Sequence, residues 1–341
     1  MIVIIGAGPI GCFVASLLAK EGKKVCVYEE HDIIGEPVQC TGIVTGKIKE
    51  IIKIKKEFIV NKLSKVKVHS LNNSVELELS EELVLDRMKF DQYLAKKAVY
   101  SGARIVLNHK FTGIEEGKAV FLDKRNNKTV KVKAEKIIGA DGPLSSVAKS
   151  VNMFENREFY TGIQARVSGK FDSNCYETYF GSTCPDFFGW VVAESNDTAR
   201  VGVACKSYPR QYFKEFLRLR GLKEEDIIEK QGGLIPVYNK NIEVQKDNIF
   251  LVGDAAGHVK ATTGGGLVPG LKAAKILADC IVNNKDYKKE LKQLERELWI
   301  HLKIRQVLNN FSDKDYDKLI DLVSKDKIKE IFKKHSRDSP F

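Results

Sequence analysis

The chain begins with MIVIIGAGPIG over residues 1–11, a short apolar run that ends in a cluster of glycines. A helical pattern follows from Ile10 to Lys20 and stops at Gly22, and a second apolar run occupies Val25–Tyr28. Strand, glycine turn, helix and strand in this order predict a βαβ unit. Such a unit indicates an α/β fold with a parallel sheet, because the crossover helix brings the second strand alongside the first.

The glycines in this turn fit the pattern GxGxxG. The first makes the turn, the second lets the backbone approach a pyrophosphate, and the third lets helix and strand pack closely. Backbone N–H groups at the start of the helix favour phosphate, and Glu29, about 18 residues past Gly11, is placed to bind ribose hydroxyls. The pattern predicts an adenine dinucleotide and leaves NAD and FAD open. The residues assigned to it are Gly6, Ala7, Gly8, Pro9, Gly11 and Glu29.

The composition is that of an ordinary globular protein. The chain has 341 residues, of which 43% are hydrophobic and 30% charged, and no apolar run approaches the roughly 20 residues of a membrane span. Its seven cysteines are scattered, and the start of the chain lacks the pattern of a signal peptide. We therefore expect free thiols and a cytoplasmic location. We also expect two domains, since single cores stop growing at roughly 250–300 residues.

The formal net charge of +11 would suit nucleic acid, an anionic membrane surface or an acidic partner. Lysines are interleaved with glutamates in segments such as Lys285–Arg296, and no aromatic-and-basic groove pattern is present. The sequence therefore predicts no nucleic-acid partner and leaves a peripheral membrane contact open. It also contains no GxSxG motif and no His, Cys and carboxylate cluster with metal spacing, so we expect neither a hydrolase nor a metal site.

Further along the chain the hydrophobic pattern alternates between strand and helix periods. Two alternating segments, Val66–His69 and Val75–Leu79, predict a small inserted sheet. Four β-rich stretches between Phe159 and Ala204 predict a separate antiparallel sheet. A strand and a helix between Ile249 and Val282 return the chain to the first domain, and the lysine-rich tail from Tyr287 to Lys334 predicts helices packed on the outside.

Two distant segments extend the glycine turn into a larger motif set: Gly139-Ala140-Asp141-Gly142, and Gly253-Asp254-Ala255-Ala256-Gly257-His258 with three glycines behind it. Together with GxGxxG they resemble the flavoprotein superfamily that includes p-hydroxybenzoate hydroxylase. The resemblance implies that the dinucleotide is FAD. Asp254 would hold its ribityl and pyrophosphate part, Gly264–Gly266 would lie near the isoalloxazine ring, and Arg87 would reach the cofactor. This adds Arg87, Asp141, Gly142, Asp254, Gly264, Gly265 and Gly266 to the FAD-binding set.

A closer resemblance lies in the segment GEPVQCTG, residues 35–42, which is similar to the segment after the second strand of archaeal geranylgeranyl reductases. In that family its cysteine, here Cys40, lies at the flavin beside the substrate alkene. The family signature P-x-x-Y-x-W-x-F-P appears in altered form over Pro185–Ala193, with Phe188 in place of tyrosine and Trp190 at its expected position. The resemblance implies that Cys40 is catalytic and that Phe188 and Trp190 face the substrate.

The resemblance implies a Rossmann-like FAD-binding domain with an inserted antiparallel β-sheet substrate domain, as in p-hydroxybenzoate hydroxylase, and C-terminal helices. We expect an FAD-binding domain made of residues 1–60, 85–155 and 245–285. Residues 156–244 would form the substrate domain, with a smaller insert near 61–84. The segment 286–341 would be a C-terminal helical tail.

The activity that the resemblance implies is FAD-dependent saturation of C=C bonds in geranylgeranyl chains of archaeal-type membrane lipids. Such an enzyme needs an isoprenoid or lipid substrate and a reduced electron donor, ferredoxin-type or another, and could work at the inner face of the membrane. The alternative is an FAD-dependent monooxygenase or dehydrogenase that acts on a small soluble substrate, because it shares every cofactor motif. A quinone-linked electron-transfer flavoprotein is disfavoured, since the cysteines for an iron–sulfur cluster are absent from the sequence.

Overall fold

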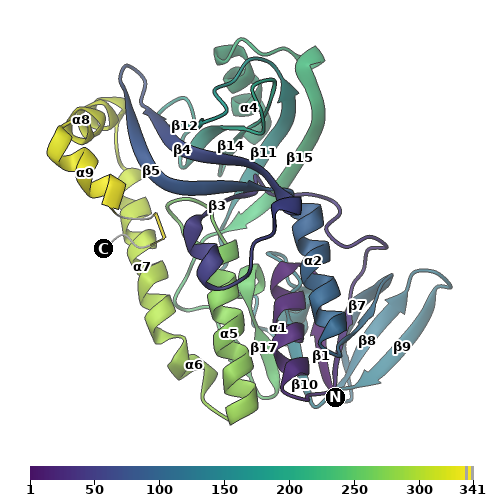
Figure 1. The fold of residues 1–341 in the computed structure, drawn as a ribbon. Helices are drawn as coiled ribbons and strands as arrows, with labels where there is room; N and C mark the ends of the chain where they lie inside the picture. Colours follow the sequence, from purple (N-terminus) through teal and green to yellow (C-terminus); the bar gives the residue numbers. More distant parts are fainter. Residues whose placement is uncertain (335–336, 339–341) are drawn as a thin grey trace. The chain divides into compact units, whose positions relative to one another are not determined.

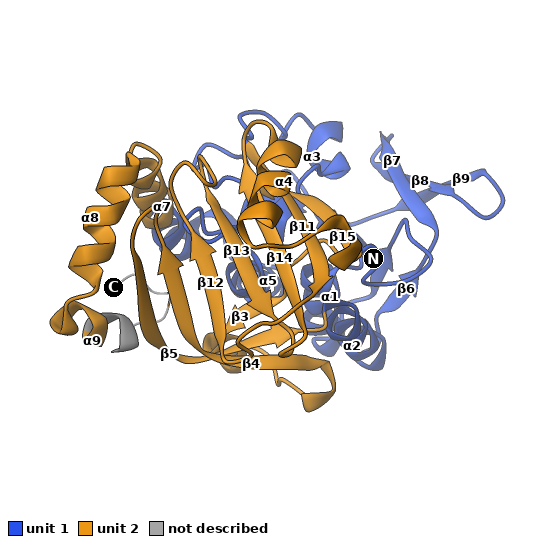
Figure 2. Cartoon of the chain, turned by 90° about the horizontal axis from the view of Figure 1, so that it is seen from above, with its two compact units in different colours: residues 1–37, 87–158, 236–299 blue, residues 38–86, 159–235, 300–341 orange. Residues whose placement is uncertain are grey.

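The computed structural model describes residues 1–334 and 337–338. They form two compact units, each assembled from three stretches of chain (Figure 2). Unit 1 contains residues 1–37, 87–158 and 236–299, and unit 2 contains residues 38–86, 159–235 and the described residues from 300 onward. These bounds differ from the expected domains in three main places. Residues 38–60 join unit 2, because a strand at 43–45 pairs into its sheet, residues 236–244 join unit 1, and the tail is divided between the units.

Unit 1 is built on a six-stranded sheet in the order β16-β17-β10-β1-β2-β6. Three of its strands, β17, β10 and β1, are labelled in Figure 1. Its strands are parallel except for the edge pair of β16 and β17, and β1 and β2 are buried along their whole length. Buried parallel strands require continuous apolar runs, which is the pattern at the start of the sequence. The strands are β1 (Ile2–Ile5), β2 (Val25–Tyr28), β6 (Arg104–Val106), β10 (Lys136–Gly139), β16 (Gln245–Lys246) and β17 (Ile249–Leu251).

Helix α1 (Pro9–Lys20) starts directly at the glycine turn, with Pro9 where a missing N–H needs no partner. It packs against α2 (Arg87–Tyr100) and α5 (Leu267–Asn283). Strands β7, β8 and β9 form a separate antiparallel sheet, and β7 is interrupted by a bulge at Gly113. The other elements of unit 1 are β7 (His109–Glu115), β8 (Lys118–Asp123), β9 (Lys128–Lys133), α3 (Ser146–Ser150), the short 3₁₀ helix η4 (Gly253–Ala256) and α6 (Tyr287–Glu290).

Unit 2 is built on an eight-stranded sheet in the order β15-β11-β14-β13-β12-β4-β5-β3. The strands of the expected insert and those of the expected substrate domain therefore form one sheet. They join where β12 pairs with β4, and this pair is parallel, which corrects the expectation of a separate and fully antiparallel sheet. The strands are β3 (Ile43–Thr45), β4 (Ile59–His69), β5 (Ser74–Leu85), β11 (Phe159–Ser168), β12 (Cys175–Tyr179), β13 (Phe188–Ala193), β14 (Thr198–Cys205) and β15 (Ile227–Pro236).

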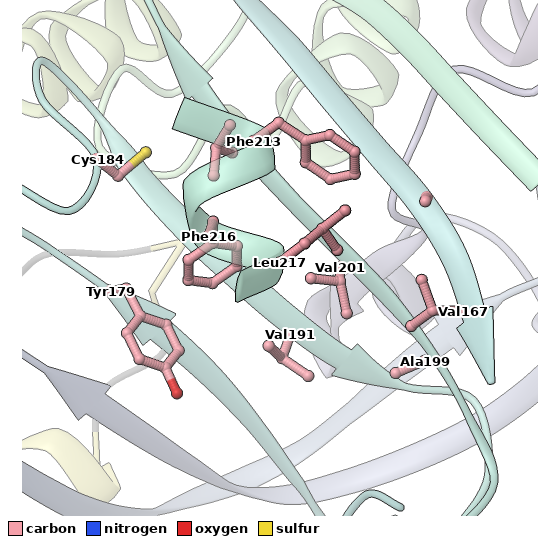
Figure 3. Packing of buried hydrophobic residues seen from close by; sticks show 11 residues of the cluster. Val167, Tyr179, Cys184, Val191, Ala199, Val201, Phe213, Phe216 and Leu217 are labelled. Atoms are coloured by element: carbon pink, nitrogen blue, oxygen red, sulfur yellow. The ribbon is translucent and has the colours of Figure 1, made fainter. Parts of the chain in front are cut away.

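One face of this sheet packs against helix α4 (Pro209–Leu219), as Figure 3 shows. Phe213, Phe216 and Leu217 of the helix meet a layer of small and branched side chains that includes Val191 and Val201. Alternation along a strand sends neighbouring residues to opposite faces. The α4 face therefore takes Val191, and the opposite face takes its neighbours in β13, among them the two aromatic residues singled out in the sequence.

The tail is helical, as the sequence predicted. Helix α7 (Lys292–Leu308) buries Leu294, Leu298, His301 and Arg305 along one face, and Arg305 is only 1% exposed. An outer helix of this kind therefore adds side chains to the core. The chain continues with α8 (Asp313–Val323) and α9 (Asp326–Lys334). None of the described helices is both long and apolar enough to cross a membrane.

Candidate functional site

The glycine turn between β1 and α1 has room for a ligand at one position and none at two others. A Cβ atom at Gly6 would lie 2.4 Å from the carbonyl oxygen of Ala140, and one at Gly11 would lie 2.1 Å from the carbonyl oxygen of Gly6. A Cβ at Gly8 would meet nothing within 4 Å. Gly8 is the N-cap of α1, and no side chain caps this end of the helix. Open space and uncapped N–H groups at a helix start suit a pyrophosphate.

Glu29 lies at the end of β2 and is tied to the glycine turn. One carboxylate oxygen accepts a hydrogen bond from the Ala7 N–H at 2.7 Å, and the other accepts from the His31 N–H at 3.0 Å and contacts the His31 ring at 2.7 Å. The Ala7 N–H is therefore directed to Glu29. A carboxylate has about four lone-pair sites, so Glu29 keeps capacity for ribose hydroxyls while it holds the turn.

Asp141 has a structural role within its own turn. One carboxylate oxygen accepts from the Ser145 hydroxyl at 2.7 Å and the other from the Val147 N–H at 3.0 Å, so the side chain fixes the start of α3. Burial raises the pKa of Asp141, although these hydrogen bonds oppose the shift. Its neighbour Gly142 has a φ of +77° and open space at its Cβ position. A cofactor contact by Asp141 and Gly142 remains a prediction.

Asp254 and Arg87 come together in unit 1 from distant parts of the sequence. Burial of Asp254 in η4 raises its pKa to about 6, and the positive charge of Arg87 opposes that shift. Arg87 forms a bidentate ion pair with Asp91 one turn along α2, at 3.1 and 3.0 Å. A Cβ at Gly266 would lie 2.7 Å from the Asp254 Oδ1 atom. The glycine at 266 thus lets the start of α5 approach the carboxylate, and the contacts of Asp254 and Gly264–Gly266 with FAD remain a prediction.

Asp254→Asn is expected to stabilise the cofactor-free protein at pH 7–8 by about 1–3 kcal/mol while it weakens FAD binding. A folded-state pKa raised to about 6 makes the ionised carboxylate destabilising. That penalty is absent below pH 4, grows through pH 6 and is complete above it. Chemical unfolding of the cofactor-free wild type and variant at pH 4.0 and pH 8.0 measures it, and an equal difference in stability at both pH values would contradict the assignment.

His258 follows the same turn and was not assigned to the site from the sequence. Its Nδ1 atom accepts the Gly253 N–H at 3.3 Å, and its Nε2 atom is buried without a hydrogen-bond partner. Burial lowers the pKa of His258 to about 4, and the nearby charge of Arg157 adds to this effect. The neutral ring therefore holds the η4 turn, which agrees with leaving it outside the catalytic set.

In unit 2 the Cys40 loop is fastened by hydrogen bonds from the large sheet. The Thr41 hydroxyl donates to the Gln164 Oε1 atom at 3.0 Å, and Arg200 donates from Nη1 to the Thr41 carbonyl at 2.6 Å. The Gly42 N–H points at the Cys40 sulfur, with N and Sγ 3.3 Å apart. Cys40 is partly exposed, whereas the other six cysteines are buried.

Trp190 and Phe188 lie on one face of β13, as their spacing predicted. Their rings are in edge contact with centroids 5.9 Å apart. Trp190 also donates its indole N–H to the Gln164 Oε1 atom at 3.1 Å. The same amide oxygen therefore links the Cys40 loop to Trp190. Neither Gln164 nor Arg200 was found from the sequence, because a single glutamine or arginine in a strand carries no motif.

Comparisons with known proteins bear on the cofactor. A family model described as FAD binding domain matches residues 1–211, more than half of the chain. The chain belongs to this FAD-binding family. FAD is its cofactor, and the open position at Gly8 together with the uncapped helix start fits it. A model described as lycopene cyclase protein matches the shorter stretch 199–334.

Relatives of this FAD-binding protein extend over almost the whole chain. Digeranylgeranylglycerophospholipid reductase 3 of Methanosphaera stadtmanae is 29% identical over 94% of this chain and 89% of its own. The digeranylgeranylglycerophospholipid reductase of Thermoplasma acidophilum is 29% identical over 95% and 91%. A solved geranylgeranyl bacteriochlorophyll reductase-like structure from T. acidophilum has a TM-score of 0.86 at 25% identity, covering 95% of this chain and 91% of that one.

Proposed function

We propose that this FAD-binding protein saturates C=C bonds of geranylgeranyl chains, on lipids of the archaeal glycerophospholipid type. The observation that carries the proposal is the Gln164 amide, which joins the two segments that resemble geranylgeranyl reductases, the Cys40 loop and the strand of Trp190. Similarity to named reductases over nine-tenths of the chain supports it independently. A monooxygenase would share the cofactor motifs, but the Cys40 and Trp190 segments resemble geranylgeranyl reductases.

Reduction of an isolated alkene needs a hydride at one carbon and a proton at the other. FAD, when bound and reduced, supplies the hydride. Within this chain Cys40 is the residue proposed to act beside the alkene, and Phe188 and Trp190 are proposed to form an apolar wall against the isoprenoid chain. The electron donor is proposed to be a reduced carrier, ferredoxin-type or another, because only one dinucleotide motif is present in the sequence.

The decisive experiment is anaerobic. The flavin-loaded protein is reduced chemically, mixed with a geranylgeranyl lipid in vesicles, and followed by product mass and flavin absorbance. A gain of two hydrogens per reduced bond, with flavin reoxidation, supports the reductase. Flavin that reoxidises only with oxygen favours the monooxygenase instead. The net charge of +11 also leads us to propose a peripheral contact with an anionic membrane. Vesicles with anionic and with neutral headgroups test this contact. The rate of lipid reduction should be higher on anionic vesicles and should fall as salt is added.

Cys40→Ala is expected to lower the rate of flavin reoxidation by lipid about 100-fold and to leave FAD bound. Cys40 lies in unit 2, whereas the residues assigned to FAD all lie in unit 1, so its loss removes none of them. Cys205→Ala is the matched control, since that thiol is buried and donates to the Ser207 carbonyl within unit 2. Equal reoxidation rates in wild type and Cys40→Ala would remove Cys40 from the mechanism.

A further inference from the structure

Three strands bring Gln164 and Trp190 together on one face of the unit 2 sheet. Gln164 on β11 pairs with Gly202 on β14, and Gly202 pairs in turn with Trp190 on β13. A Cβ atom at Gly202 would lie 2.5 Å from the Trp190 ring and 2.6 Å from the Gln164 Cβ atom. The missing side chain at Gly202 therefore lets the glutamine and the indole meet across the intervening strand.

Both polar atoms of the Gln164 amide have hydrogen-bond partners in this arrangement. Its oxygen accepts from the Thr41 hydroxyl and from the Trp190 indole, and its nitrogen donates to Gln231 at 2.6 Å. Gln164 is only 5% exposed, and its bond to Trp190 is buried, whereas those to Thr41 and Gln231 are partly buried. Three hydrogen bonds favour one orientation of the amide, because its rotation would break them.

Arg200 holds the same loop from a second direction. Its Nε atom donates to Glu194 at 2.7 Å, and its Nη1 atom donates to the carbonyls of Thr41 and Leu85 at 2.6 and 3.3 Å. Arg166 donates to the other oxygen of Glu194 at 2.6 Å, with 43% of its side chain exposed. Arg166 and Arg200 thus share Glu194. Of the two, Arg200 also donates to the Thr41 carbonyl and so holds the Cys40 loop.

We propose that Gln164 and Arg200 are positioning residues, which fix the Cys40 thiol by holding the side chain and the carbonyl of its neighbour Thr41. This inference rests on the proposed function, because it assigns the thiol a fixed place beside the reacting alkene. Displacement of a reacting group by about 1 Å can cost about 100-fold in rate. Gly42 has a φ of +77°, which favours glycine. A Cβ atom at Gly42 would lie 2.5 Å from the Arg200 Nη1 atom, so the missing side chain leaves room for the guanidinium group.

The first test measures the loop without any substrate. Cys40 is the partly exposed cysteine among six buried ones, so iodoacetamide at low concentration reports on it, with Cys40→Ala as the blank. In the flavin-loaded protein, Thr41→Val and Gln164→Leu should raise the alkylation rate about tenfold, because each removes the bond that holds the Thr41 side chain. Thr41→Ser keeps the hydroxyl and should restore the wild-type rate. Arg200→Lys should also raise it, whereas Arg166→Ala should leave it unchanged.

The second test measures turnover of the same variants with geranylgeranyl lipid, after flavin content and circular dichroism establish that each one folds. We expect Thr41→Val and Gln164→Leu to lower kcat about tenfold to 100-fold with little change in KM, and Thr41→Ser to recover most of the loss. Unchanged alkylation in both variants overturns the inference whatever the activity. Faster alkylation with an unchanged kcat also overturns it. If the wild type reduces no lipid, the proposed function fails, and the alkylation rates still decide whether the two residues hold the loop.

Discussion

Gly8→Ala is expected to fold and to bind FAD about 100-fold more weakly, whereas Gly11→Ala is expected to lose about 3 kcal/mol or more of stability. The two glycines belong to one motif, but their surroundings differ. A Cβ at Gly8 meets nothing within 4 Å, so the added methyl occupies the space proposed for the pyrophosphate. A Cβ at Gly11 lies 2.1 Å from a backbone oxygen of Gly6, which no side-chain rotation can relieve.

Fluorescence titration with FAD and urea unfolding of the cofactor-free proteins separate these effects. The N-cap position tolerates alanine less well than glycine, so a loss of up to about 1 kcal/mol in Gly8→Ala is consistent with the proposal. Gly22→Ala is a control for conformational strain alone, because Gly22 has a φ of +72° with open space around its Cβ position. Wild-type FAD affinity in Gly8→Ala would exclude the pyrophosphate from this position.

Glu177→Gln is expected to destabilise unit 2 by about 2–3 kcal/mol at pH 7. Glu177 accepts hydrogen bonds from the Tyr179 hydroxyl at 2.6 Å and from Arg220 at 2.8 and 3.1 Å, and it pairs with His69 at 2.9 Å. Burial alone would raise its pKa, but the bonds from His69 and Tyr179 and the charge of Arg220 lower it to about 2. In the variant, the neutral glutamine amide leaves the Arg220 charge without its carboxylate partner at a largely buried position, which destabilises the fold.

The pH dependence follows from the direction of that shift. Because the folded-state pKa is lowered, the contribution of Glu177 is present above its unfolded pKa of about 4.3 and is lost as the pH falls toward 2. Urea unfolding at pH 7, 4 and 3, followed by Trp190 fluorescence in a Trp299→Phe background, should show the difference between wild type and Glu177→Gln shrinking. Glu76→Gln in the same sheet breaks an exposed pair with Lys65 and should cost less than about 0.5 kcal/mol. A pH-independent difference would mean that Glu177 acts through packing.

The sequence predicted the parts of the fold that local patterns encode. The glycine turn, the apolar runs Ile2–Ile5 and Val25–Tyr28, and the helix after Gly266 are each recognised from neighbouring residues, and the structure confirms them. The pairing of β12 with β4 could not be read in this way. Alternation places Tyr176 on one face of a strand but does not select its partner, which comes from more than 100 positions earlier in the chain.

The same distinction applies to the candidate site. Cys40, Trp190 and the assigned glycines stand out because each lies in a motif. Gln164 and Arg200 lie in strands as ordinary polar residues, and their importance arises only when Thr41 folds back onto them. Asp141 differs from these two residues, because it lies in a motif but its carboxylate accepts hydrogen bonds from Ser145 and Val147 at the start of α3. A motif can therefore mark a structural residue as well as a proposed ligand contact, and it says little about the groups that hold the site in place.

The threefold division of each unit also governs how the protein is made. Unit 1 needs residues up to 299 and unit 2 needs residues from 300 onward, so neither unit can close before most of the chain has left the ribosome. The long hairpin of β4 and β5 must wait for β12 before its open edge is covered, and an uncovered edge invites pairing with other chains. Any contiguous fragment that contains the whole of one unit therefore also contains long stretches of the other.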